Sequence, residues 1–207
     1  MKEQYHRQIT TDALSPNMAE SALKIIISAN LGQDALRYQF GHDHFHYDNN
    51  SFDTANAYAE ELRQSVLVAV QQSDSASALT SFGQLTHTVQ DFYAHSNYVH
   101  LWRASHPNAP AEEIQPEIQE LMKDTRLHSG KLYYPLEALS FIAFFRPLVL
   151  PLLPRDSHAW MNLDAPDRPG FELAFAAAVK RTTLEYHRIS QQLNSKQAIL
   201  FRGKNPL

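Results

Sequence analysis

The spacing of apolar residues along the chain predicts α-helices over most of its length. The clearest case follows Ser51 or Asp53, either of which can cap a helix, and its apolar side chains recur every three or four residues, at Ala55, Tyr58, Leu62, Val66 and Val70. Similar spacing predicts further helices over residues 17–31, 76–100, 114–124, 136–145 and 171–193. No segment alternates convincingly between apolar and polar residues, so we expect an all-α fold.

The predicted helices are enough for a single-domain bundle of five or six helices. We place this domain at residues 1–195 and a C-terminal tail at residues 196–207. The segments 35–51 and 158–169 contain many polar and aromatic residues, and we expect them to be long metal-binding loops that carry the function.

Composition limits the chemistry that such a bundle can support. The chain has no cysteine, so any metal ion must be held by His, Asp, Glu or main-chain groups. Its net charge of −4 and the lack of a long basic run argue against binding to duplex nucleic acid. Histidine is the unusual feature, with 11 residues in a chain of 207.

One predicted helix carries three potential metal ligands. His87, Asp91 and His95 follow one another at intervals of four residues, so their side chains project from one face of the helix. An imidazole and a carboxylate one turn apart can bind the same divalent ion, and the second imidazole is better placed for a neighbouring ion. The alternative is an exposed polar stripe, but the many apolar residues around the triad favour metal binding.

A second group of potential ligands lies in residues 41–50, which contain His42, His44 and His46 together with two aspartates, Asp43 and Asp48. In an extended loop the three histidines would lie on the same side. We expect His46 to be a ligand, and His42 and His44 to be exposed or to support the ligands. The alternative is a surface patch of histidines.

Single residues elsewhere complete the set of candidates. His6 lies near the start of the chain, Asp34 follows the predicted helix 17–31, and His158 and Asp164 share one predicted loop. Taken alone, each has an ordinary interpretation as an exposed side chain, a turn residue or a helix cap. We expect a second set of residues to be structural: His100, His106, Glu185 and His187.

The longest apolar stretch, residues 136–153, contains Glu137, Arg146 and two prolines and is a poor membrane-spanning segment. It is either an interfacial lip that makes transient contact with a membrane surface or a buried helix followed by a Pro-rich link. The first ten residues are polar and lack the apolar core of a signal peptide. We therefore expect a cytoplasmic protein, or one exported without a cleaved leader.

Five phrases of the sequence together resemble the zinc-dependent phospholipase C and single-strand nuclease superfamily, and within it the heterokaryon-incompatibility (Het-C) branch. The most specific phrase is HTVQDFYAHSNYV at residues 87–99, and it is supported by YHRQITTDAL, SANLGQD, FHYDN and SHAWMNLDAP. The resemblance extends over about residues 5–187. It implies a helical fold that holds two or three zinc ions through His and Asp side chains.

The resemblance also implies which residues bind these ions. The first zinc would be held by His46, His87 and Asp91, and Asp91 would bridge to another zinc held by His6. The remaining zinc would be bound by the last candidates along the chain, His95, His158 and Asp164.

Two further aspartates are implied as catalytic candidates. Asp34 would be a ligand or the general base beside the metal-bound water, and Asp48 is its rival. In the secreted phospholipases and nucleases that the sequence resembles, an N-terminal Trp binds one of three zinc ions through its amino group and carbonyl. This sequence has no Trp near its start, so we expect that third zinc site to be altered, filled by Asp34, or empty. His158 and Asp164 are also six residues apart, rather than one helical turn as in those enzymes.

The resemblance implies hydrolysis of a phosphodiester, above all of a glycerophospholipid by a phospholipase C that uses a metal-bound hydroxide. One alternative is a phosphodiesterase similar to the single-strand nucleases. Another is a non-catalytic, Het-C-like recognition protein with a structural metal ion. The doublet His42-Asp43 also suggests an HD-type phosphohydrolase, but that pattern leaves the triad of residues 87, 91 and 95 unused.

Overall fold

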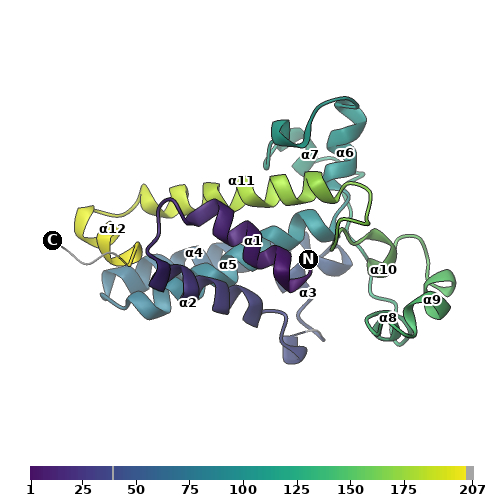
Figure 1. Cartoon of the computed structure of the whole chain (residues 1–207), viewed down its shortest axis with the longest axis horizontal. Coiled ribbons are helices and arrows are strands. Elements are labelled where there is room, and N and C mark those ends of the chain that lie inside the picture. The colour runs from purple at the N-terminus through teal and green to yellow at the C-terminus, as the bar shows by residue number, and fades with distance from the viewer. Residues whose placement is uncertain (39, 204–207) are drawn as a thin grey trace.

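The body of the molecule is an elongated bundle of long helices (Figure 1). The computed structural model describes residues 1–38 and 40–203. The long helices are α1 (Glu3–Leu14), α2 (Glu20–Gly32), α4 (Phe52–Gln71), α5 (Ser75–His95) and α11 (Phe171–Ser190). No strand forms among the described residues, so the expected all-α class is confirmed.

Helix α5 is the centre of this bundle and packs against α2, α4 and α11. Every residue from Leu85 to Ser96 is buried, whether it is apolar or polar. A helix that is covered on all sides has no need for an amphipathic pattern. The polar side chains in this half of α5 must therefore find partners inside the protein.

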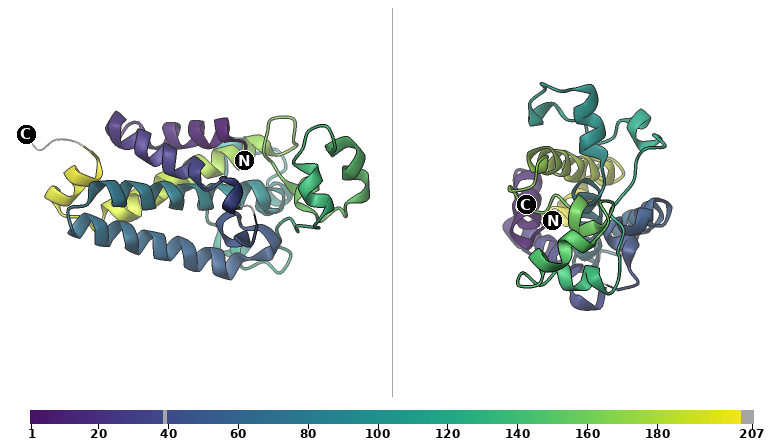
Figure 2. Two further views of the ribbon diagram at one scale, coloured as in Figure 1. Left: turned by 90° about the horizontal axis from the view of Figure 1, so that it is seen from below. Right: turned by 90° about the vertical axis from the view of Figure 1, so that its right-hand side faces the viewer.

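Shorter elements surround the bundle. Between α2 and α4 lie η1 (Leu36–Tyr38), α3 (Asp43–His46) and η2 (Asp48–Asn50). After α5 come α6 (Tyr98–Ser105), η3 (Ala111–Glu113) and α7 (Gln119–Met122). One end of the molecule carries α8 (Leu136–Ser140), α9 (Arg146–Val149), η4 (Leu150–Leu152) and α10 (His158–Met161), and α12 (Ser195–Phe201) lies at the other end (Figures 1 and 2).

Several predicted boundaries are wrong. The helix predicted over 76–100 stops at His95, because Ser96 adopts an extended backbone conformation and bridges to Ser129. Only residues 119–122 of the predicted helix 114–124 are helical. The predicted tail at residues 196–207 is partly helical, because α12 (Ser195–Phe201) begins with a capping box just before it and buries Phe201 completely. The segment 35–51 is not an extended loop but contains three short helical turns.

The structure of the apolar segment 136–153 contradicts one of the two interpretations given above. The predicted helix 136–145 ends at Ser140, and most of the large apolar side chains that follow are exposed: Phe141, Ile142, Phe144, Phe145, Leu148 and Leu152. The interpretation of this segment as a buried helix is therefore wrong. None of the helices in residues 1–38 and 40–203 combines the length and apolarity that are needed to cross a bilayer.

A buried ion network fixes α11 against α4, as expected for a structural Glu185. The Glu185 carboxylate is fully buried and accepts hydrogen bonds from Arg63 at 2.7 and 2.9 Å, and from Arg181 at 2.7 Å. Burial would raise the pKa of Glu185, but these guanidinium groups lower it to about 2. The neighbouring His187 is exposed at the surface of the bundle.

The close contact between α2 and α5 depends on a glycine. A Cβ atom on Gly83 would lie 2.3 Å from the main-chain oxygen of Ile26 and 2.7 Å from the Cβ atom of Ala29. Both distances are far below van der Waals contact, and the Ile26 oxygen belongs to helical backbone that cannot easily move aside. Glycine therefore sets the distance between the two helices at this point.

We predict that Gly83→Ala destabilises the fold although alanine favours helices. Overpacking costs about 1–3 kcal/mol, which corresponds to a fall in melting temperature of roughly 2–12 °C for a chain of this size. Thermal unfolding followed by circular dichroism measures this change. Gly32→Ala is the matched control, because no atom lies within 4 Å of the added carbon. A melting temperature that falls equally in both variants would contradict the close contact.

Candidate metal centre

A buried cluster of imidazole and carboxylate groups occupies the C-terminal half of α5. His87, Asp91 and His95 project from one face of the helix and have exposed fractions of 0%, 1% and 5%. Residues from α1, α3, η2 and α10 surround this face. The helical spacing seen in the sequence therefore brings the three side chains into one interior site, not onto the surface.

Three potential ligand atoms converge at the first half of the cluster. His46 Nδ1 and His87 Nε2 each lie 3.0 Å from the same oxygen, Asp91 Oδ2. The two ring nitrogens are 3.1 Å apart. Neighbouring ligand atoms around a tetrahedral zinc ion are about 3.4 Å apart, as follows from Zn–N and Zn–O bonds of about 2.1 Å. The three atoms lie slightly closer together than this, so a small outward shift of the side chains would give the spacing of a tetrahedral coordination sphere.

Asp34 supplies the fourth group of this site. Its Oδ1 atom lies 3.7 Å from His87 Nε2, and its side chain is 38% exposed. One ligand atom from each of Asp34, His46, His87 and Asp91 lies within 4.8 Å of all the others. These four residues, which we call the Asp91 site, come from the turn after α2, from α3 and from α5.

The other oxygen of Asp91 faces a second group of residues. Asp91 Oδ1 lies 2.6 Å from the amino nitrogen of Met1 and 3.2 Å from His6 Nε2. The same amino nitrogen is 3.3 Å from Asp164 Oδ1. Burial would lower the pKa of the Met1 amino group, but Asp91 and Asp164 raise it to about 11. This amino group is therefore a cation held between two carboxylates.

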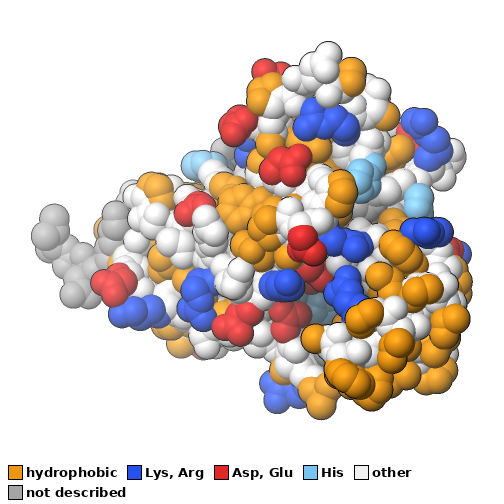
Figure 3. Space-filling view, turned by 45° about the vertical axis from the view of Figure 1, so that its right-hand side comes forward, with side chains coloured by type: hydrophobic (Ala, Val, Ile, Leu, Met, Phe, Trp, Pro, Cys, Tyr) orange, Lys and Arg blue, Asp and Glu red, His pale blue; other side chains and the backbone are white. Residues whose placement is uncertain are grey.

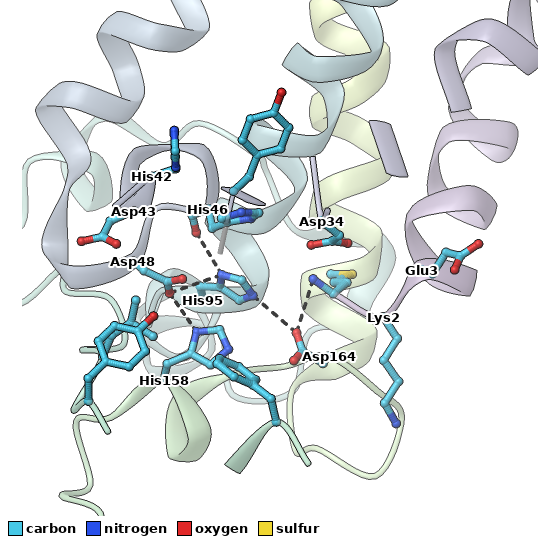
Figure 4. Close-up of a pocket in the computed structure, with 15 residues that line it drawn as sticks. Lys2, Glu3, Asp34, His42, Asp43, His46, Asp48, His95, His158 and Asp164 are labelled. Carbon is cyan, nitrogen blue, oxygen red and sulfur yellow. Dashed lines mark hydrogen bonds and ion pairs between the residues drawn. The ribbon is translucent and has the colours of Figure 1, made fainter. Parts of the chain in front are cut away.

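Asp48, His95 and His158 form a further trio, which we call the Asp48 site. Asp48 Oδ1 lies 2.8 Å from His158 Nδ1 and 3.4 Å from His95 Nδ1. His95 Nδ1 also donates to the main-chain oxygen of His46 at 2.9 Å, and its Nε2 atom lies 3.5 Å from Asp164 (Figure 4). Existing hydrogen bonds thus engage most of the polar atoms of this trio.

Electrostatics divide the imidazoles into two kinds. Burial lowers the pKa of His87, so this ring is neutral near pH 7 and has a lone pair for a metal ion. Burial acts on His95 in the same direction, but Asp91 and Asp48 raise its pKa to about 9. Burial would raise the pKa of Asp91, yet the Met1 amino group and His95 hold it well below its usual range.

The hydrogen bonds around Gln90 set the tautomer of His6. The Thr182 hydroxyl donates to the main-chain oxygen of Ala178 at 2.8 Å, so it must accept from Gln90 Nε2, which lies 3.1 Å away. Gln90 Oε1 therefore faces His6 Nδ1 at 2.7 Å and accepts its proton. The lone pair of a neutral His6 is left on Nε2, which points at Asp91.

A cavity of about 250 Å³ connects this cluster with the outside. Asp34, His46, His95 and Asp164 line it, and Figure 4 shows them facing one another across the opening. The Asp91 site therefore faces this opening through Asp34 and His46, while His87 and Asp91 lie behind them.

The structure brings together all the residues that the sequence suggested as metal ligands. They are His6, Asp34, His46, His87, Asp91, His95, His158 and Asp164, and the catalytic candidate Asp48 lies among them. His42 and His44 lie outside both sites, because residues 43–46 form a helical turn in which alternate side chains diverge. The doublet of His42 and Asp43 is therefore outside both sites too.

Sequence reasoning missed two groups. The amino group of Met1 carried no sequence signal beyond its position. Gln90 was hidden because it sits between the ligands of α5 and looks like an ordinary helical residue. The only sequence signal for a supporting role was its position, one residue before Asp91. In the structure its side chain contacts α1 and α11.

These observations define an all-α protein with buried histidines and aspartates around one central helix. The chain belongs to the family of VWA7 N-terminal domains, whose model matches residues 2–123, more than half of the sequence. It is also 31% identical over 98 residues to the human protein "von Willebrand factor A domain-containing protein 7". That alignment covers 46% of this chain and 11% of the human protein. No solved structure matches the chain.

The family match overturns the resemblance to the zinc-dependent phospholipases C, the single-strand nucleases and the Het-C branch. It covers the phrase at residues 87–99 on which that resemblance mainly rested. The expected phospholipase C activity, and with it the classification as a lipid-degrading hydrolase, is therefore wrong. The physical reason is that ligands four residues apart follow from helix geometry, which specifies a binding face but not a reaction. The general-base role of Asp34 or Asp48 depended on that reaction alone.

We predict that neutral His6 carries its proton on Nδ1. Long-range proton–nitrogen NMR spectra distinguish the two tautomers of a histidine ring, and the Nδ1-protonated pattern is expected for His6. Gln90→Leu removes the acceptor, and the preference for this tautomer should then be lost. A spectrum in which the wild-type His6 is protonated on Nε2 would contradict the hydrogen-bond assignment at Gln90.

Proposed function

We propose that this chain is a non-catalytic, metal-binding helical module in which one divalent ion, zinc, stabilises the bundle at the Asp91 site. The observation that carries the proposal is that four potential ligands, Asp34, His46, His87 and Asp91, each bring one ligand atom to within 4.8 Å of the others. Structural zinc sites are closed by four protein ligands, whereas catalytic sites keep one position for water. The ligand count thus supports a structural ion.

The ligand chemistry suits zinc. Two imidazole nitrogens and two carboxylate oxygens are the donors that zinc accepts, and softer thiolate ligands are absent from a chain without cysteine. A doubly charged ion also balances the two carboxylates of Asp34 and Asp91 when both imidazoles are neutral. The complex then has no net charge, which suits a site whose other three ligands are buried.

Metal binding at this site would connect parts of the chain that are distant in sequence. Asp34 follows α2, His46 ends α3, and His87 and Asp91 belong to α5. The ion would fix the short helical turns of residues 36–50 against the central helix. Such a link stabilises the folded state by the free energy of metal binding, because the unfolded chain does not hold the ligands together.

The Asp48 site is the place for a second ion. Its polar atoms are already engaged by hydrogen bonds, so a metal ion must displace the contact between Asp48 and His158. An ion at the Asp91 site displaces a contact too, between His46 and Asp91, but that site offers four potential ligands and the Asp48 site offers three. We therefore infer that the Asp91 site fills first and the Asp48 site fills only at higher metal concentration. A third ion near Asp164 would have to replace the Met1 amino group.

We predict that zinc raises the melting temperature of the full chain. At a free zinc concentration of about 100 times the dissociation constant, the stabilisation is about 2.7 kcal/mol, or roughly 5–11 °C. His87→Ala removes one ligand, so both the bound zinc and the stabilisation should fall steeply. Elemental analysis after dialysis and thermal unfolding with and without EDTA measure the two quantities.

His187→Ala is the matched control, because this exposed imidazole on α11 lies outside both candidate sites. It should retain the zinc content and the stabilisation of the wild type. Wild-type protein that holds no zinc after dialysis would contradict the metal site. Hydrolysis of a phosphodiester that requires both zinc and His87 would contradict the structural role of the ion.

A further inference from the structure

The end of the molecule that carries α8, α9 and η4 exposes an unusual number of large apolar side chains. We call residues 138–155 the apolar lobe; Figure 3 shows its side chains gathered at the lower right. Phe144, Leu148 and Leu152 have exposed fractions of 77%, 66% and 67%. A contiguous apolar surface of this kind marks a site of contact with a partner or a membrane.

Hydrogen bonds to α10 hold the lobe in a defined shape. The Glu137 carboxylate is fully buried and accepts a hydrogen bond from the main-chain nitrogen of Ala159 at 2.6 Å. The indole nitrogen of Trp160 donates to the main-chain oxygen of Leu150 at 3.0 Å. These bonds tie α8 and η4 to α10, so the outward-facing side chains are exposed because the fold presents them, not because the segment lacks anchoring.

The charges within the lobe are all positive. Residues 138–155 contain Arg146 and Arg155 but no Asp or Glu. Besides these arginines, the only polar side chain in the segment is Ser140, which is buried. A protein partner would find almost no hydrogen-bonding groups here, although protein interfaces generally carry about one hydrogen bond per 100–200 Å². The hydrocarbon region of a lipid bilayer forms no hydrogen bonds and so does not need such groups.

A cleft of about 580 Å³ lies at the base of the lobe, and the cationic side chains of Lys2, Arg146 and Arg168 line it. Asp164 and Asp167 line it too, but Asp164 is engaged by the Met1 amino group and His95. Both guanidinium groups donate to main-chain oxygens, including that of Ala159. Among the described residues, neither forms an ion pair with a carboxylate.

From this arrangement we propose that the apolar lobe docks on the surface of a membrane that contains anionic phospholipids. Phe144, Leu148 and Leu152 enter the boundary between head groups and acyl chains, and Arg146 and Arg168 bind the phosphate oxygens of the lipids. Apolar burial and attraction to anionic lipid act together in this mode of binding. The docking is a property of the lobe and is separate from metal binding at the Asp91 site.

Sedimentation with vesicles tests this inference on the full chain. The protein should bind vesicles of equimolar phosphatidylcholine and phosphatidylserine, and bind vesicles of phosphatidylcholine alone much more weakly. Replacing two exposed apolar residues, in Phe144→Ser with Leu148→Ser, should weaken binding at least about tenfold. Arg146→Gln should weaken it about fivefold, and added salt should have a similar effect on the wild type.

Val68→Ser is the matched control, because Val68 is an exposed apolar residue on α4, outside the lobe. It should bind as the wild type does. A second measurement needs no variant: lipids with bromine on their acyl chains should quench the fluorescence of Trp160, which contacts η4, while Trp102 is buried in the bundle.

Three results would overturn the proposal. One is unchanged vesicle binding by the double variant at residues 144 and 148, and another is equal binding to neutral and anionic vesicles. The third is a wild-type protein that binds no vesicles but forms dimers that the double variant cannot form. That result would make the lobe an interface between two copies of this chain.

Discussion

The buried carboxylate of Asp91 is the constraint on which this end of the molecule depends. A carboxylate that is only 1% exposed must have its charge matched inside the protein. Asp91 has the imidazoles of His46 and His87 at one oxygen, and the Met1 amino group and the His6 imidazole at the other. Its partners come from α1, α3 and α5, so the need to neutralise one carboxylate fixes how these elements meet. The Gln90 network continues the same arrangement toward α11 through Thr182.

Much of this arrangement was predictable from the sequence because it depends on helical periodicity. The long helices and the common face of His87, Asp91 and His95 follow from spacing alone. The end of α5 was not predictable in this way, since Ser96 breaks the helix through a bridge to Ser129, a residue distant in sequence. Short helical turns in residues 36–50 were missed because one turn is too short to show a period. They decide that His46 enters the site while His42 and His44 do not.

The chemical use of the cluster was less predictable than the residues that form it. Structural and catalytic ions in a helical bundle can both be bound by His and Asp side chains spaced one helical turn apart. The same sequence pattern therefore fits both roles of the ion. What separates them is the number of ligands that close the site, and in our proposal Asp34 would be the fourth ligand. Asp34 carries no pattern of its own, because it only follows the last turn of α2. Its distance of 3.7 Å from His87 appears only in three dimensions.

The prolines of the apolar lobe have a consequence for the unfolded chain. Cross-β aggregation needs segments of about six residues with high apolarity and no proline. Pro147, Pro151 and Pro154 divide the second half of the lobe into pieces of two or three residues, too short for such pairing. Residues 139–145 have no such interruption and are flanked by charge only at Glu137 and Arg146. While the protein is being synthesised, this heptapeptide is the part of the lobe that chaperones have most reason to cover.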